Sequence, residues 1–162
     1  ARCSTRASSS SGRSTSPRNL RPTPQCPRSP DDSQSTGFDY YSSLVAYGPL
    51  VTTALQAAKT AADEGRSIEV IDLRSISPLD VDTVAESVQR TGRLIVTHEA
   101  PVFLGVGAEI AARITERCFF HLEAPVARVG GFTLPYPPAK LEEHFLPDVD
   151  RILDAVDRTF AA

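Results

Sequence analysis

From Ser43 to the end of the chain, short runs of β-branched residues alternate with longer segments whose apolar residues recur at helical spacing. Residues 43–47, 68–73, 93–97 and 126–129 are the expected strands. Each gap between two strands, and the segment after the last strand, holds one helical pattern. Strand–helix alternation with short connections predicts a parallel sheet with right-handed crossovers and helices on both faces. The sequence therefore predicts an α/β fold of three layers, α/β/α, with a mostly parallel sheet.

The expected helices have recognisable beginnings and ends. Pro49 suits the first turn of a helix, where its missing N–H would have no partner. Gly65 and Gly92 are placed to end the first two helices in the left-handed conformation. Asp80 is a suitable N-cap, and the last helix is expected to begin near Asp148 or Asp150. Each expected helix has a set of apolar residues on the side that is predicted to face the core. In chain order these sets are Val51, Ala54, Leu55, Ala58, Ala61 and Ala62 in the first helix; Val81, Val84, Ala85 and Val88 in the second; Ile110, Ala111, Ile114 and Cys118 in the third, which spans 107–120; and Ile152, Leu153, Val156 and Phe160 in the last.

The first 36 residues have a different composition. They contain ten Ser, six Arg, five Pro and four Thr, with one Leu and no Val, Ile, Phe, Tyr or Trp. Such a segment cannot bury enough apolar surface to offset about 1–2 kcal/mol of backbone ordering per residue. Tyr40, Tyr41 and Ser42 are poor continuations of a strand, so the first strand is expected to be short. We expect residues 1–42 to form a disordered tail and residues 43–162 to form the domain.

Charge divides near the same place. Six Arg against Asp31 and Asp32 give the first 36 residues a charge of +4, and subtracting this from the total of −3 leaves −7 for the rest. An acidic domain repels phosphate backbones, which argues against nucleic acid as a partner. The sequence has no apolar run approaching the roughly 18–20 residues that cross a bilayer. The Arg- and Ser-rich tail leaves a mitochondrial transit peptide as a less favoured alternative, because it is Pro-rich and lacks apolar residues.

Individual residues give weak signals for chemistry. The segment 104–108, LGVGA, follows a strand and opens a helix, as a phosphate-binding turn does, but Ile110 stands where a dinucleotide fingerprint has its third glycine. A turn that lets the helix pack closely on the strand is favoured, and an anion at the helix N-terminus stays open. Three cysteines, Cys3, Cys26 and Cys118, show no ligand-like spacing and favour a reducing compartment.

The histidines and the proline-rich connector give signals that are equally weak. His98 and Glu99 end the third strand, where open α/β sheets place functional groups. Adjacent strand residues point to opposite faces, so an interface or structural role is favoured over acid–base chemistry. His121 and His144 lack metal-ligand spacing. The segment 134–138, LPYPP, is expected to be a rigid connector, with docking as the alternative. We therefore assign no catalytic, cofactor-binding or metal-binding residue from these signals.

Three segments, VAYGPLVTTALQAA (45–58), IDLRSISPLD (71–80) and HEAPVFLGVGAEIAARITERCFFHLEAPVARVGGFTLPYP (98–137), carry a family resemblance. They resemble the beta subunits of 2-oxo acid dehydrogenases, and ERCFFHLEAP (116–125) is more similar to the branched-chain enzymes than to the pyruvate enzymes. The resemblance implies a transketolase C-terminal-like domain. It also implies an enzyme that pairs beta with alpha subunits, binds thiamine diphosphate and magnesium, decarboxylates branched 2-oxo acids and passes the acyl group to a lipoyl acyltransferase core.

In that family a pyrimidine-binding domain precedes this one and carries the glutamate that activates the cofactor, and we find no match to it here. The resemblance thus implies subunit contact and acyltransferase docking, the latter largely electrostatic, with no cofactor held by this chain. The expected partners are an alpha subunit, a second beta subunit and the acyltransferase. The expected compartment is the bacterial cytoplasm, or the mitochondrial matrix in a eukaryote. The candidate contact residues are His98, Glu99, Gly130, Phe132, Tyr136, Glu142, Glu143, Asp148 and Asp150.

Two hypotheses follow. The first is a subunit-association and docking domain, truncated or disrupted by a frameshift or a miscalled start, since the tail resembles GC-rich coding DNA read out of frame. The second is a non-catalytic orphan, either a fragment without function or a reused interaction module. In both cases we expect apolar surface that the upstream domain would cover, and hence self-association.

Overall fold

The computed structural model describes residues 41–162. The expected disordered tail, 1–42, lies outside the described residues except for its last two. The elements in chain order are β1 (Tyr41–Ala46), α1 (Leu50–Asp63), β2 (Ser67–Asp72), α2 (Val81–Thr91), β3 (Leu94–Pro101), α3 (Val106–Cys118), the 3-10 helix η1 (Phe119–His121), β4 (Ala127–Gly131), the 3-10 helix η2 (Ala139–Leu141), α4 (Glu142–Phe145) and α5 (Val149–Phe160).

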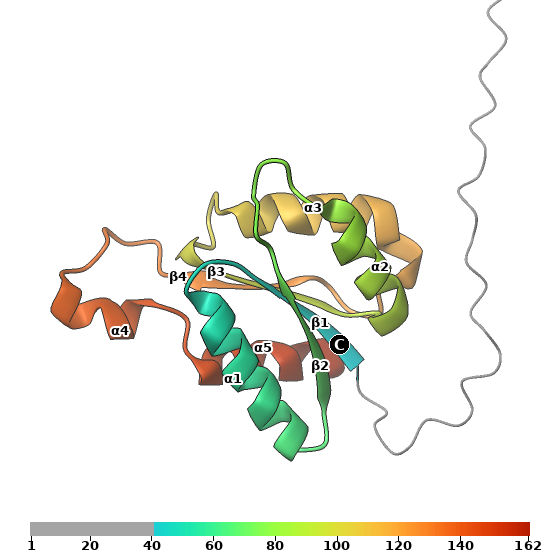
Figure 1. The fold of residues 1–162 in the computed structure, drawn as a ribbon, viewed down its shortest axis with the longest axis horizontal. Coiled ribbons are helices and arrows are strands. Elements are labelled where there is room, and N and C mark those ends of the chain that lie inside the picture. Colours follow the sequence, from blue (N-terminus) through green and yellow to red (C-terminus); the bar gives the residue numbers. More distant parts are fainter. Residues whose placement is uncertain (1–40) are drawn as a thin grey trace, which may run out of the picture. The chain divides into compact units, whose positions relative to one another are not determined.

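The four strands form one sheet in the order β2-β1-β3-β4, and every pair is parallel. Helices α1 and α5 cover one face of the sheet, and α2 and α3 cover the other (Figure 1). The three-layer α/β/α architecture with a parallel sheet is therefore confirmed.

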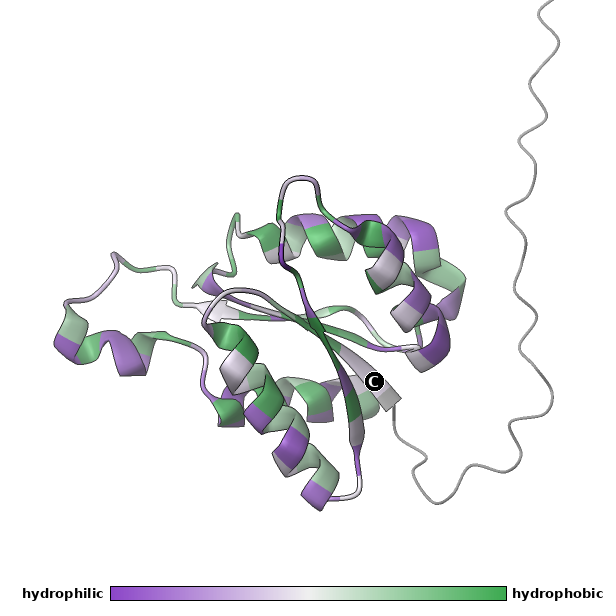
Figure 2. Cartoon of the chain, in the orientation of Figure 1, coloured by the Kyte–Doolittle hydropathy of each residue, from purple (hydrophilic) through white to green (hydrophobic). Residues whose placement is uncertain are grey.

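Alternation along the central strands builds a core on each face. Val45 and Val96 pack with α2 and α3, whereas Leu44 and Ile95 pack with α1 and α5. Because both faces are covered, each of these strands contains a continuous buried apolar run, residues 44–46 in β1 and 94–96 in β3. Figure 2 shows the same division, with hydrophilic residues on the outer sides of the helices.

The expected helix ends agree with the structure. Asp80 accepts a hydrogen bond from the backbone of Thr83 at the start of α2, and Asp148 accepts one from Arg151 at the start of α5. Gly65 and Gly92 have φ of +82° and +72°, which is the left-handed conformation predicted for them.

Two expectations are wrong in detail. Helix α1 buries Leu50, Ala54, Ala57 and Ala61, so the buried stripe is rotated relative to the prediction and Leu55 is 56% exposed. The connector after β4 contains η2 and the single turn α4, which were not predicted.

The first strand begins two residues earlier than expected, at Tyr41, although Ser42 and Ser43 are polar. Both serines are fully buried. The Ser43 hydroxyl lies 2.6 Å from that of Ser87 and 2.7 Å from that of Thr91, and Ser87 donates to Glu69. Partners supplied by α2 therefore allow a polar side chain inside a central strand.

Within residues 41–162, none of the helices combines the length and the apolar character needed to cross a membrane.

Candidate functional site

The carboxyl ends of the strands meet at one edge of the sheet, and His98 lies there inside the protein. Its side chain is fully buried. Its Nδ1 lies 2.8 Å from the carbonyl oxygen of Ala100. Since a carbonyl can only accept, Nδ1 carries the proton and donates it, which leaves Nε2 as an acceptor. Nε2 is buried and has no hydrogen-bond partner among the described residues.

Three glycines enclose the imidazole of His98. A Cβ added to Gly105 or Gly107 would lie 2.5 Å from the ring, and one added to Gly130 would lie 3.1 Å from it. Gly105 and Gly107 open α3, whereas Gly130 is in β4. The Tyr47 ring lies beside it, with a centroid separation of 6.3 Å. We call this arrangement the His98 cage.

The His98 cage explains the glycine turn at the start of α3. The space that a side chain would occupy at Gly105 and Gly107 is filled by an imidazole. The turn therefore packs a helix closely on a strand, as predicted. The His98 ring occupies the space beside its glycines that a phosphate would need. Burial lowers the pKa of His98, partly offset by the hydrogen bond to Ala100, so the ring is held neutral.

A second cluster forms beside the cage, where the connector after β4 returns to α5. Phe145 of α4 is buried, and the rings of Tyr136 and Phe132 lie edge-on to it at 5.1 and 6.3 Å. The Arg151 guanidinium lies 4.6 Å from the centroid of Phe132 and donates to the carbonyl of Gly130 at 2.6 Å. These residues, which we call the Phe145 cluster, fix the connector against the sheet edge.

The Tyr136 hydroxyl donates a hydrogen bond to Glu142. This contact with a carboxylate raises the pKa of Tyr136 to about 12, because removing the phenolic proton would place two negative groups together. The pair ties the exposed connector to α4.

Exposed acidic residues flank Phe145 along the chain, in α4 and at the start of α5. Glu143 and Asp150 are exposed, and no ion pair joins either of them to another described residue. Asp148 is also exposed and caps α5. Glu99 is half-buried in β3 and raises the pKa of Tyr47, although burial of that ring is the larger cause. These exposed carboxylates lie close in the sequence to the partly exposed rings of Phe132 and Tyr136.

The structure thus brings most of the candidate residues together but divides them by role. Phe132, Tyr136, Glu142 and Asp148 make the internal contacts of the connector, and Glu143 and Asp150 face outward. His98 and Gly130 are buried and present no side-chain surface to a partner. Sequence reasoning missed Arg151 and Phe145, which hold the cluster together. A signal for Arg151 was its place three residues after the capping Asp148.

Other candidate chemistry is limited in the part of the chain that the structure describes. Residues 41–162 contain no group of three or more His, Cys, Asp or Glu side chains arranged to hold a metal ion. Cys118 is a free buried thiol, and burial raises its pKa, which makes it unreactive at neutral pH.

Comparison with known proteins identifies the family. Residues 42–152 match the family described as Transketolase, C-terminal domain. A solved structure described as a split gene transketolase, inactive beta4 tetramer, superposes with a TM-score of 0.61 at 28% identity, covering 78% of this chain and 39% of that one.

The curated relatives are named as beta subunits either of pyruvate dehydrogenase or of branched-chain 2-oxo acid dehydrogenases. The chain is 59% identical to the 3-methyl-2-oxobutanoate dehydrogenase subunit beta of Mycobacterium tuberculosis (strain ATCC 25618 / H37Rv), over 71% of this chain and 33% of the relative. It is 56% identical to the pyruvate dehydrogenase E1 component subunit beta of Leifsonia xyli, over 74% of this chain and 36% of the relative. It is 49% identical to the 2-oxoisovalerate dehydrogenase subunit beta 2, mitochondrial, of Arabidopsis thaliana, over 72% of this chain and 32% of the relative. The resemblance to 2-oxo acid dehydrogenase beta subunits is confirmed, and the chain spans about a third of the length of these relatives.

Proposed function

Because this chain belongs to the transketolase C-terminal domain family, we propose that it is a subunit-association and acyltransferase-docking domain. The larger enzyme would be the thiamine-dependent decarboxylase component of a branched-chain 2-oxo acid dehydrogenase complex. The observation that carries the proposal is the acidic, aromatic surface that the Phe145 cluster holds at one end of the domain. Relatives named as subunits of branched-chain and pyruvate dehydrogenases support the choice of complex.

The proposal leaves thiamine diphosphate and magnesium to the intact enzyme. The glycine turn at α3 is the one candidate phosphate site that the sequence raised, and His98 fills the space against its glycines. The described residues also lack a metal-ligand cluster. These residues therefore do not fit the cofactor. What the domain contributes is contact.

Docking through this surface would be electrostatic. Glu143, Asp148 and Asp150 lie on a domain of net negative charge, and a basic docking domain would complement them. Exposed charges attract such a partner over roughly 10 Å at about 0.1 M salt and over about 3 Å at about 1 M salt. Complementary charge acts chiefly on the association rate and on the choice of partner. Phe132 and Tyr136 would add apolar contact beside the charges.

Calorimetric titration of the full chain with a basic acyltransferase docking domain tests the proposal. The double variant Glu143→Gln/Asp150→Asn should weaken binding roughly tenfold or more, and binding should decline steeply with salt. The double variant Asp63→Asn/Glu86→Gln is the matched control, because it removes two exposed acids from α1 and α2. Equal losses in both variants, or binding that salt does not change, would contradict the assignment of this surface.

A mixing experiment separates this proposal from the alternative of an orphan or a reused interaction module. The full chain is combined with the alpha subunit, the acyltransferase and a branched 2-oxo acid, with a full-length beta subunit as the positive control. The proposal expects the chain to join the complex without turnover of its own. The orphan alternative expects no association with either partner. The relatives' names place such enzymes in bacteria and in mitochondria, and we propose the bacterial cytoplasm or the mitochondrial matrix accordingly.

A further inference from the structure

The connector after β4 leaves the sheet as an exposed stretch rich in proline. Its residues 134–138, LPYPP, which we call the proline segment, belong to neither a helix nor a strand. The side chains of Leu134 and Tyr136 are 66% and 57% exposed. Figure 1 shows the connector and α4 projecting beyond the sheet.

The proline segment has the geometry of a polyproline II helix. Proline fixes φ near about −65°, and the residue before a proline is pushed to an extended ψ. Every residue from 134 to 137 is a proline, precedes one, or does both. Pro138 has a φ of −58° and a ψ of 153°, close to the polyproline II values of about −75° and +145°.

The three residues per turn of this helix give the segment three edges. Leu134 and Pro137 share one edge. Pro135 and Pro138 share the second. Tyr136 forms the third, and its ring packs on the Phe145 cluster. The domain therefore holds the tyrosine edge, and the other two edges leave apolar side chains available to a partner.

The backbone of the proline segment is also available. Among the described residues, no hydrogen bond involves the carbonyl oxygens of Pro135, Tyr136 or Pro137, or the backbone N–H of Tyr136. Polyproline II makes no internal hydrogen bonds, and prolines have no N–H to donate. The segment therefore offers mainly acceptors, and a partner would meet it with donors.

Internal contacts fix the proline segment before any partner arrives. After it, the Leu141 N–H donates to the carbonyl oxygen of Pro138 at 2.8 Å. Within it, the Tyr136 hydroxyl donates to Glu142. Before it, Phe132 belongs to the Phe145 cluster. Ordering a flexible segment opposes binding, and a segment that is already held avoids much of that cost.

We propose that the proline segment is a ligand for an aromatic-lined groove on a partner protein. Residues 135–138, PYPP, have the P-x-x-P spacing of segments that dock in such grooves. The two outward edges seat against aromatic rings, whose indole N–H or phenolic O–H groups donate to the free carbonyl oxygens.

Charge next to the segment favours a groove with a basic rim. Residues 139–150 contain four acidic residues and one lysine, Lys140. A basic rim complements this balance. The inference rests on the proposed function and deepens it, because it assigns the aromatic groove to the basic docking domain of the acyltransferase.

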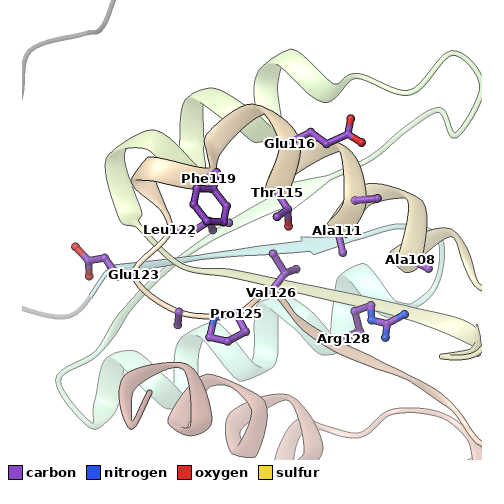
Figure 3. Close-up of a pocket in the computed structure, with 12 residues that line it drawn as sticks. Ala108, Ala111, Thr115, Glu116, Phe119, Leu122, Glu123, Pro125, Val126 and Arg128 are labelled. Atoms are coloured by element: carbon purple, nitrogen blue, oxygen red, sulfur yellow. The ribbon is translucent and has the colours of Figure 1, made fainter.

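A second copy of this chain does not fit as the occupant. The groove between α3 and the segment before β4 is lined mostly by alanines and other small or aliphatic side chains, with Phe119 as its one aromatic ring (Figure 3). A polyproline II helix needs several rings to seat its prolines. The groove that receives the segment therefore belongs to a different protein.

Calorimetric titration of the full chain with the acyltransferase docking domain tests the inference. Pro135→Ala/Pro138→Ala should raise the dissociation constant about tenfold or more, because it removes both rings of one outward edge and loosens the backbone. Pro125→Ala is the matched control, since Pro125 is an exposed proline of another loop (Figure 3), and should leave the dissociation constant unchanged. A decaproline peptide, which has the same helix without the acidic residues, should displace the wild-type chain from the docking domain.

Circular dichroism checks that each variant is folded, and the decaproline competition needs no variant. Docking that the double proline variant leaves unchanged, an equal loss in Pro125→Ala, or docking that decaproline does not displace would overturn the inference and leave the proposed function standing. Absence of docking by the wild-type chain would overturn both.

Discussion

Replacing Gly107 by alanine tests the packing of the His98 cage directly. The added Cβ would lie 2.5 Å from Nε2 of His98, whereas ordinary contacts begin at 3.4 Å, so the ring or the helix must move by 0.9 Å (3.4 − 2.5). Overpacking of this kind costs about 1–3 kcal/mol. Alanine returns at most about 1 kcal/mol through helix propensity. We expect a net loss of about 1–2 kcal/mol, or roughly 4 °C in melting temperature per kcal/mol for a domain of this size.

The assay is urea unfolding followed by circular dichroism near pH 8, where His98 is neutral. Gly107→Ala is measured in the wild-type chain and again with His98→Ala, which vacates the space that the new methyl group would enter. In the second background the substitution should be neutral or stabilising, giving a coupling energy of about 1–3 kcal/mol. A Gly107→Ala variant as stable as wild type, or an equal loss in both backgrounds, would refute the reasoning.

Two further predictions concern stability. Because burial lowers the pKa of His98 in the folded chain, the unfolded chain binds a proton below about pH 6.5 that the folded chain does not. The His98 contribution to the free energy of unfolding is therefore constant above about pH 6.5. Below that pH the free energy of unfolding falls by up to about 1.4 kcal/mol per pH unit, until the pH reaches the lowered pKa of the folded state. This dependence, measured by urea unfolding at pH 5 to 8, should be reduced in His98→Gln and kept in His121→Gln; an unchanged dependence in the first variant would contradict it. Asp148→Ala removes the N-cap of α5 and should cost about 1 kcal/mol, whereas Asp150→Ala, in the same first turn, should cost less; thermal unfolding compares the two, and equal losses would argue against the cap.

Much of the fold was predictable because its signals are local. Strand–helix alternation defined the layers, and the left-handed glycines Gly65 and Gly92 ended the helices as expected. The capping residues Asp80 and Asp148 were likewise visible, since a cap needs only a polar side chain at the right place. These features depend on neighbours within a few residues.

The start of β1 was missed because its support is distant in the sequence. Ser43 is stable inside a strand because Ser87 and Thr91, more than 40 residues away, supply hydrogen bonds. Local propensity treats such a serine as the end of a strand. The sequence position of a polar residue cannot reveal a partner that the tertiary structure provides.

The site was predictable only in outline. The resemblance selected the residues from Gly130 to Asp150 as a group, and the structure does place most of them at one end of the domain. The roles within the group depend on Arg151 and Phe145, whose contacts with Phe132 and Gly130 arise from chain reversal through α4. The burial of His98 under glycines from the start of α3 and from β4 was hidden for the same reason.

We propose that this domain makes subunit contacts and leaves the cofactor to the intact enzyme, since the His98 imidazole fills the space beside its glycine turn. Calorimetric titration of the full chain with thiamine diphosphate and magnesium tests that claim most directly. We expect no saturable heat at cofactor concentrations up to about 1 mM. The absence of saturation at that concentration means that the binding free energy is weaker than about −4 kcal/mol. A saturable titration with micromolar affinity would contradict it.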